Sequence, residues 1–197
     1  AAAAAVDAIA ASSYLDAGRV SQLYSTLGKK ALQAKQYAQA DALISKAAAL
    51  QPNSVELLML QGDARLASGR KAEALAAYQQ VIKARTAAGQ KPEEELYKRA
   101  VQAAYDARLP TAPDIALQWV SAYPNAESWR NSIAIYRNTA KPDLEGTVDL
   151  LRLMRAAGTL NRAADLNLYV TALVEQSNFI EAQNAVGQAQ TAPGVDA

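Results

Sequence analysis

The sequence lacks two side chains on which metal and nucleophilic chemistry often depends, because its 197 residues include no cysteine and no histidine. Their absence excludes disulfides, thiol nucleophiles and His-based triads, and it removes the usual ligands of structural zinc and iron–sulfur clusters. A G-x-S-x-G elbow, a glycine-rich phosphate loop and a paired-carboxylate motif are also missing from the sequence. We therefore expect a protein that is not an enzyme and that holds no metal and no cofactor.

A surplus of charge of one sign is missing as well, since 20 Lys and Arg residues stand against 19 Asp and Glu residues. Nucleic-acid-binding proteins concentrate positive charge, so we expect no nucleic-acid partner. No apolar run approaches the ~18 residues that a membrane-spanning helix needs, and we expect no direct membrane span.

Signals for β-structure are scarce. Only 9 glycines and 7 prolines interrupt the chain, and runs of β-branched and aromatic residues are few. Half of the residues are apolar, and alanine, the best helix former, dominates them. This composition predicts an all-α protein.

The residues that are present repeat with a period of 34. A shift of the chain by this amount superposes small residues on small ones and large residues on large ones. The pairs are Tyr24 with Leu58, Gly28 with Gly62, Leu32 with Leu66, Ala40 with Ala74, Ile44 with Tyr78, and Ala47 with Val81. Apolar spacings of three and four residues predict two antiparallel helices per unit, over residues 20–34 and 37–50 in the first. Gly28 and Ala40 are expected to be small because the two helices cross there at short distance.

The spaced residues form a recognisable motif. The first copy reads Tyr24-x2-Leu27-Gly28-x2-Ala31, then Ala40-x3-Ile44, then Pro52, and the second reads Leu58-x2-Gln61-Gly62-x2-Arg65, then Ala74-x3-Tyr78. This pattern resembles the tetratricopeptide repeat (TPR) family. The resemblance implies a right-handed superhelical solenoid of antiparallel helix pairs with about five repeats. Thr86 stands where the second copy would have its proline, so the helix there is predicted to run further than its counterpart before Pro52.

The motif divides the chain into six segments. They are an N-terminal helical lead-in or cap (1–20), two TPR units (21–54 and 55–88), two degenerate units (89–125 and 126–160), and a fifth unit with a tail (161–197). In the fourth unit Ile133 replaces the usual small residue. The link from Thr86 to Pro92 contains Gly89 and is a candidate flex point between a regular and a divergent half.

The resemblance also implies where a partner binds, since TPR proteins bind peptides or protein surfaces on the concave face made by their first helices. In register, the predicted partner-binding residues are Lys29, Met59, Asp63, Tyr97, Tyr105, Arg130, Arg137 and Asn138. Arg130 and Arg137 lie two turns apart on one helix face, beside Asn138, so an acidic segment of another protein is the expected ligand, because guanidinium groups bind carboxylates bidentately. Tyr97 and Tyr105 are its expected stacking anchors. The alternative is that both arginines are solvated surface charges.

Three functions remain open at this point. The first is a non-catalytic adaptor or scaffold that binds a protein partner on its concave face, as part of a larger assembly. The second is a structural subunit of a bacterial envelope or secretion complex, which would use its convex face and its ends. The third is an enzyme or enzyme accessory, for which the motifs give no support. The start of the chain, AAAAAVDAIA, has the small residues that surround export-signal cleavage sites, which slightly favours a periplasmic, exported bacterial protein over a cytoplasmic one. An alanine-rich helical lead-in explains the same residues without export.

Overall fold

The computed structural model describes residues 2–12 and 14–191, with side chains up to Gly187. Every regular element in these residues is an α-helix, which confirms the all-α prediction. The helices are α1 (Ala2–Ser12), α2 (Ala17–Gln33), α3 (Tyr37–Leu50), α4 (Val55–Ala67), α5 (Lys71–Ala87), α6 (Glu94–Asp106), α7 (Ala112–Ala122), α8 (Ala126–Ala140), α9 (Leu144–Ala156), α10 (Ala163–Glu175) and α11 (Phe179–Thr191).

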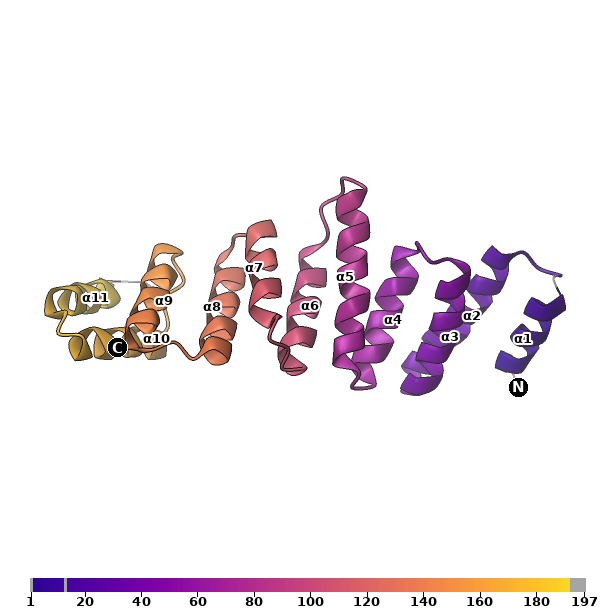
Figure 1. The fold of residues 1–197 in the computed structure, drawn as a ribbon, viewed down its shortest axis with the longest axis horizontal. Helices are drawn as coiled ribbons and strands as arrows, with labels where there is room; N and C mark the ends of the chain where they lie inside the picture. The colour runs from indigo at the N-terminus through magenta and orange to yellow at the C-terminus, as the bar shows by residue number, and fades with distance from the viewer. Residues whose placement is uncertain (1, 13, 192–197) are drawn as a thin grey trace. The chain divides into compact units, whose positions relative to one another are not determined.

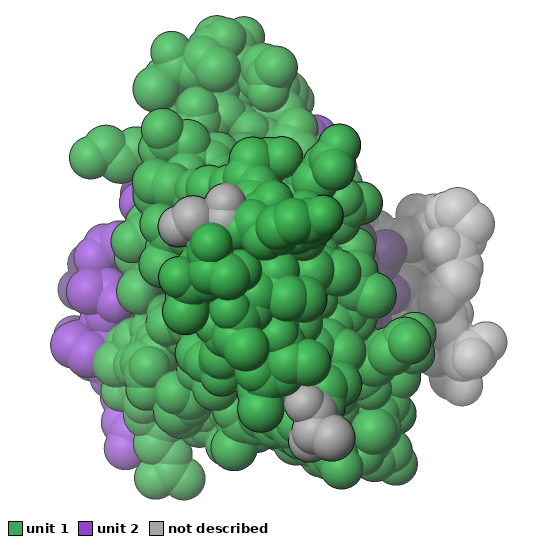
Figure 2. All heavy atoms as spheres, turned by 90° about the vertical axis from the view of Figure 1, so that its right-hand side faces the viewer, with its two compact units in different colours: residues 1–109 green, residues 110–197 purple. Residues whose placement is uncertain are grey.

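The chain forms two compact units, which Figure 2 shows in different colours. Unit 1 comprises residues 1–109 and contains α1 to α6, and unit 2 comprises residues 110–197 and contains α7 to α11. The boundary between the units falls inside the segment 89–125 that the sequence suggested as a third repeat. The division of the chain into a lead-in and five repeats therefore stays a prediction.

Within unit 1, each helix packs against the next one along the chain, from α1 to α6, and α2 also contacts α4 (Figure 1). Short turns join the helices, so neighbours run antiparallel. The first helices of the two predicted TPR pairs, α2 and α4, are thereby brought side by side on one face. Their partners α3 and α5 form the other layer.

A glycine lies at the crossing point in each pair of unit 1. A Cβ atom added to Gly28 would lie 2.6 Å from Cγ1 of Ile44, and one added to Gly62 would lie 2.8 Å from Cδ1 of Tyr78. Both distances are too short for real atoms, so only glycine lets the helices approach this closely. The two crossings are separated by 34 residues, which confirms the physical meaning of the repeat.

The helix ends of unit 1 follow local rules. The Asp16 side chain accepts a hydrogen bond from the backbone N–H of Arg19 (2.9 Å) and caps α2. α3 ends at Leu50, two residues before Pro52, whereas α5 has 17 residues against 14 in α3. The longer helix before Gly89 confirms the prediction made from Thr86.

The candidate flex point between Thr86 and Pro92 is wrong as a division of the molecule. α6, which follows this link, belongs to unit 1 and packs against α5. An ion pair between Arg85 and Glu93 (3.4 Å) spans the link. The compact units divide instead after Leu109.

In unit 2, α7 packs against α8, α8 against α9, α9 against α10 and α10 against α11. Ile133 from α8 is buried in one apolar core with Val148, Leu151 and Met154 from α9. Trp119 exposes only 2% of its surface, and Trp129 is partly buried against the same core. The tryptophans therefore serve packing, as large aromatic side chains at helical spacing usually do.

Three polar clamps recur within the residues whose side chains the structure describes, each made of a carboxylate, a tyrosine and a cation from three consecutive helices. In the first, Asp7 of α1 accepts hydrogen bonds from the Tyr24 hydroxyl and the Lys46 ammonium group, both at 2.6 Å. The second joins Asp63, Tyr78 and Arg99 of α4, α5 and α6. The third joins Arg152, Tyr169 and Glu181 of α9, α10 and α11. Each clamp therefore links three consecutive helices by side-chain hydrogen bonds.

Candidate functional site

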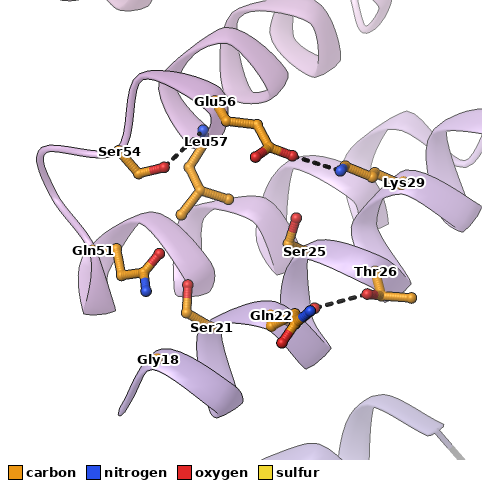
Figure 3. Close-up of a pocket in the computed structure, with 10 residues that line it drawn as sticks. All are labelled: Gly18, Ser21, Gln22, Ser25, Thr26, Lys29, Gln51, Ser54, Glu56 and Leu57. Carbon is orange, nitrogen blue, oxygen red and sulfur yellow. Dashed lines mark hydrogen bonds and ion pairs between the residues drawn. The ribbon is translucent and has the colours of Figure 1, made fainter.

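A hollow of about 350 Å³ opens on the face of unit 1 where α2 and α4 lie side by side. We call it the polar hollow; Figure 3 shows its lining. α2 contributes the backbone of Gly18 and the side chains of Ser21, Gln22, Ser25, Thr26 and Lys29. The turn before α4 and the first turn of α4 contribute Gln51, Ser54, Glu56 and Leu57.

Small residues create the space. Gly18, Ser21 and Ser25 lie on one face of α2, at spacings of three and four residues. The Ser25 hydroxyl points toward the segment that holds Ser54 and Glu56 (Figure 3), whereas the Ser21 hydroxyl donates to the Ala47 carbonyl of α3 at 2.9 Å. Because these three residues are small, this part of α2 leaves room in front of α4.

The two charged groups of the hollow neutralise each other. The Lys29 ammonium group donates to the Glu56 carboxylate at 2.6 Å, and both side chains remain about half exposed or more. The predicted residue Lys29 therefore does line a concave surface, but as part of an ion pair with α4.

The other predicted residues of α4 differ from Lys29. Met59 is partly exposed on α4. The Asp63 carboxylate accepts hydrogen bonds from the Tyr78 hydroxyl (2.8 Å) and from Arg99. Burial, and next the bond to Asp63, raises the pKa of Tyr78, so the hydroxyl stays protonated and keeps donating. Asp63 thus belongs to a polar clamp, which occupies it within the fold.

The two predicted stacking anchors lie on α6 and differ in exposure. Tyr97 exposes 7% of its surface and is part of the core, while Tyr105 exposes 40%. A ligand ring or planar group can reach Tyr105 but has little of Tyr97 to contact. The spacing of eight residues did not reveal this difference, because the two positions do not project in the same direction from the helix.

In unit 2, α8 carries the predicted basic group. The Arg130 Nη2 atom donates to the Asn161 side chain at 3.0 Å, and its Nε atom is buried with no hydrogen-bond partner among the described residues. Arg137 lies 3.9 Å from the Asp165 carboxylate, a loose ion pair, and Asn138 beside it is exposed. The structure therefore brings Arg130 and Arg137 to the side of α8 that faces the start of α10.

Glu56, Gln51 and Ser54 are site residues that the sequence reasoning missed. The signal for Glu56 was available, since it lies 34 residues after Gln22 and so occupies the same position of the repeat. Gln51 and Ser54 belong to a turn, and sequence periodicity does not predict on which side of a turn a side chain lies. Their place in the hollow required the structure.

In residues 2–12 and 14–191, no group of three or more Asp or Glu side chains is arranged to hold a metal ion. No helix in the same residues is long and apolar enough to cross a membrane.

Taken together, the stacked antiparallel pairs, the glycine crossings and the 34-residue period define a helical solenoid with the TPR fold, as the motif predicted. Solved structures show the same fold. A crystal structure of MamA protein covers 86% of this chain and 89% of its own with a TM-score of 0.58 and 14% identity. MamA from Desulfovibrio magneticus RS-1, from its residue 41 to the end, covers 87% and 93% with a TM-score of 0.55 and 15% identity. YrrB, described as a TPR protein with an unusual peptide-binding site, covers 85% and 83% with a TM-score of 0.54 and 13% identity.

Sequence comparisons are less informative. No family model matches the chain, and no curated protein matches it. Identities of 13–15% to the solved structures support the fold alone.

Proposed function

We propose that this protein is a non-catalytic scaffold that binds a segment of another protein on the face made by its first helices, as part of a larger assembly. The observation that carries the proposal is the polar hollow between α2 and α4. It is a concave site with unpaired hydrogen-bonding groups, built on two rigid helices, and its volume lies in the range of ligand sites. The peptide-binding site for which YrrB is described supports the same use of a TPR fold.

A second contact of the same partner is proposed for unit 2. Arg130, Arg137 and Asn138 would bind an acidic segment, since two guanidinium groups on one face suit carboxylates. Arg137 has only a loose ion-pair partner at 3.9 Å, and Arg130 donates to the uncharged side chain of Asn161 at 3.0 Å. Neither guanidinium group has a close carboxylate partner among the described residues, so both positive charges are available to an acidic ligand. Exposed charge pairs are screened by salt, so this contact should weaken as the ionic strength rises.

A crosslinked affinity purification tests the proposal. Partners are identified by mass spectrometry for the wild type, for Arg130→Glu with Arg137→Glu, and for a control with the same change of charge, Lys30→Glu with Lys83→Glu. Both control lysines are exposed and have no ion pair within the described part of the chain. Overlapping synthetic peptides of each captured protein are then titrated against the three purified variants to locate the segment that binds.

Three outcomes are decisive. Loss of an acidic peptide in the arginine variant alone supports the contact in unit 2. Equal binding of that peptide by all three proteins contradicts the acidic-segment contact and leaves the scaffold function standing. If no peptide of any captured protein binds the wild type, the scaffold function is wrong, and a structural role of the convex face or the ends becomes the better explanation.

A further inference from the structure

We infer that the polar hollow binds an uncharged, amide-rich stretch of polypeptide, centred on an Asn or Gln side chain, and that it rejects an acidic one. This inference rests on the proposed scaffold function and specifies the ligand of one of its sites. It assigns to unit 1 a chemistry opposite to that expected at Arg130 and Arg137.

The first argument is charge. Lys29 and Glu56 are the only charged side chains of the lining, and they pair with each other at 2.6 Å. A charged ligand group would have to compete with one of them for the other, and it would leave the displaced partner without a counter-ion. An uncharged polar group enters without this cost.

The second argument is the supply of hydrogen-bond donors and acceptors. The side chains of Gln22, Ser25 and Gln51 make no hydrogen bond within the described residues, so two carboxamides and one hydroxyl are available to a ligand. The Thr26 hydroxyl already donates its proton to the Gln22 carbonyl at 2.8 Å, which leaves its oxygen as an acceptor. Ser21 is 1% exposed and donates to the Ala47 carbonyl at 2.9 Å, so its hydroxyl is used within the fold.

The lining therefore offers donors and acceptors together, as an amide does. A carboxylate would bring acceptors only and would face the oxygen of Thr26, whose proton is already donated. An ammonium group would bring donors only and would leave the N–H groups of the two carboxamides unused. The amide is the group that satisfies both sets.

The third argument is space. A volume of about 350 Å³ exceeds that of one side chain, so an Asn or Gln can enter with the peptide groups on either side of it. Gly18 has no side chain to occupy this end of the hollow, where a Cβ atom would lie 3.1 Å from Oδ1 of Asp16 and 3.6 Å from Nε2 of Gln51. The ten lining residues include no aromatic ring on which a sugar could stack, which favours a peptide over a carbohydrate.

The experiment follows the side-chain amide signals of the full chain by ¹H–¹⁵N NMR during titration with three probes. They are a capped Ala-Asn-Ala tripeptide, the matching Ala-Asp-Ala tripeptide and cellobiose. The Asn probe should shift the NH₂ signals of Gln22 and Gln51, and the Asp probe should bind at least about tenfold more weakly, as expected for the loss of about one good hydrogen bond.

Two variants locate the binding. Ser25→Leu fills the floor of the hollow and should abolish the shifts. Gln51→Ala removes an exposed carboxamide and buries no additional side chain. The role of the hollow can therefore still be tested with this variant if Ser25→Leu does not fold. Ser121→Leu, on the exposed surface of α7, is the matched control and should bind the Asn probe as the wild type does.

Equal or tighter binding of the Asp probe, binding of cellobiose alone, or an absence of shifts with all three probes would each overturn the inference. None of these results bears on partner capture, which judges the scaffold function separately. If the Asn probe does not bind to the hollow while the full protein still captures its partner, the proposed ligand class is wrong and the scaffold function is not affected.

Discussion

The two units stack helices in the same way but fill the crossing between paired helices differently. In unit 1, Gly28 and Gly62 of the first helices pack against Ile44 and Tyr78 of the second helices. At each crossing a large side chain fills the space that the glycine leaves. In unit 2, Ile133 of α8 occupies the core together with branched residues of α9. The contrast teaches that the period of 34 follows from a specific packing solution. Where the glycine is given up, the strict spacing of the motif is no longer required.

The polar clamps show the same freedom in another form. In the clamp of α4, α5 and α6 in unit 1, the carboxylate, Asp63, comes from the first helix of a pair and the tyrosine from the second. In unit 2 the tyrosine, Tyr169, comes from α10 and the carboxylate, Glu181, from α11. The helices exchange roles, yet the carboxylate accepts from a tyrosine and an arginine in both. What is retained is the set of hydrogen bonds, since each partly buried group needs a partner.

The largest expected effect tests the packing of unit 2. Ile133 is 4% exposed, so Ile133→Ala should lower the free energy of unfolding by about 2–5 kcal/mol, through lost burial and the cavity that is left. Both tryptophans of the chain, Trp119 and Trp129, lie in unit 2, so tryptophan fluorescence during urea unfolding reports on this unit. Leu117→Ala, at a residue that is 59% exposed, is the control and should change the stability by less than about 1 kcal/mol.

If Ile133→Ala is tolerated as well as Leu117→Ala, the small residue of the motif is optional in unit 2, and the contrast between the units weakens. Circular dichroism of the same samples reports on helices of both units. A second transition that stays unchanged in Ile133→Ala would show that the units unfold separately.

A smaller effect of opposite origin is expected in unit 1. Gly62→Ala places a Cβ atom against the ring of Tyr78, which is fully buried and cannot move aside. We expect a loss of about 1–3 kcal/mol from this overpacking, even though alanine is the better helix former. Gly187→Ala is the matched control, because nothing lies within 4 Å of a Cβ atom there, and it should stabilise the protein by up to about 1 kcal/mol. Equal signs for the two variants in chemical unfolding would disprove the close crossing.

The sequence was sufficient for features that repeat and insufficient for those that depend on a particular neighbour. The shift of 34 residues predicted a close helix crossing at Gly28 and Ala40 and aligned Gly28 with Gly62. The structure adds that these glycines pack against Ile44 and Tyr78, a packing reason that acts at both sites. The sequence also predicted that the helix before Pro52 ends there and that its counterpart in the second unit runs further, as α3 and α5 do.

The candidate site was predicted only in part, for reasons of geometry. Lys29 lines the hollow between α2 and α4, but its partner Glu56 was not named. Asp63 was expected to face a ligand and is instead bonded to Tyr78 and Arg99, which are 15 and 36 residues away. Such pairs depend on rotamers and on the angle between helices, and these are not encoded in a spacing along one helix.

The smallest effect concerns the clamp of unit 2 and depends on pH. Hydrogen bonds from Arg152, and next from Tyr169, lower the pKa of Glu181 from 4.5 to about 2. Because the pKa is lower in the folded than in the unfolded protein, the contribution of Glu181 is complete above about pH 4.5 and is lost as the pH falls toward 2. Glu181→Gln should cost less than about 1 kcal/mol at neutral pH, since the clamp lies near the surface. The difference from the wild type should vanish toward pH 2.

Glu175→Gln, at an exposed residue of α10, is the control and should show no such convergence when fluorescence-detected unfolding is repeated across this range. A constant difference between Glu181→Gln and the wild type at every pH would mean that the clamp acts through shape alone. The two units would then share a set of contacts but not the electrostatic reason for it.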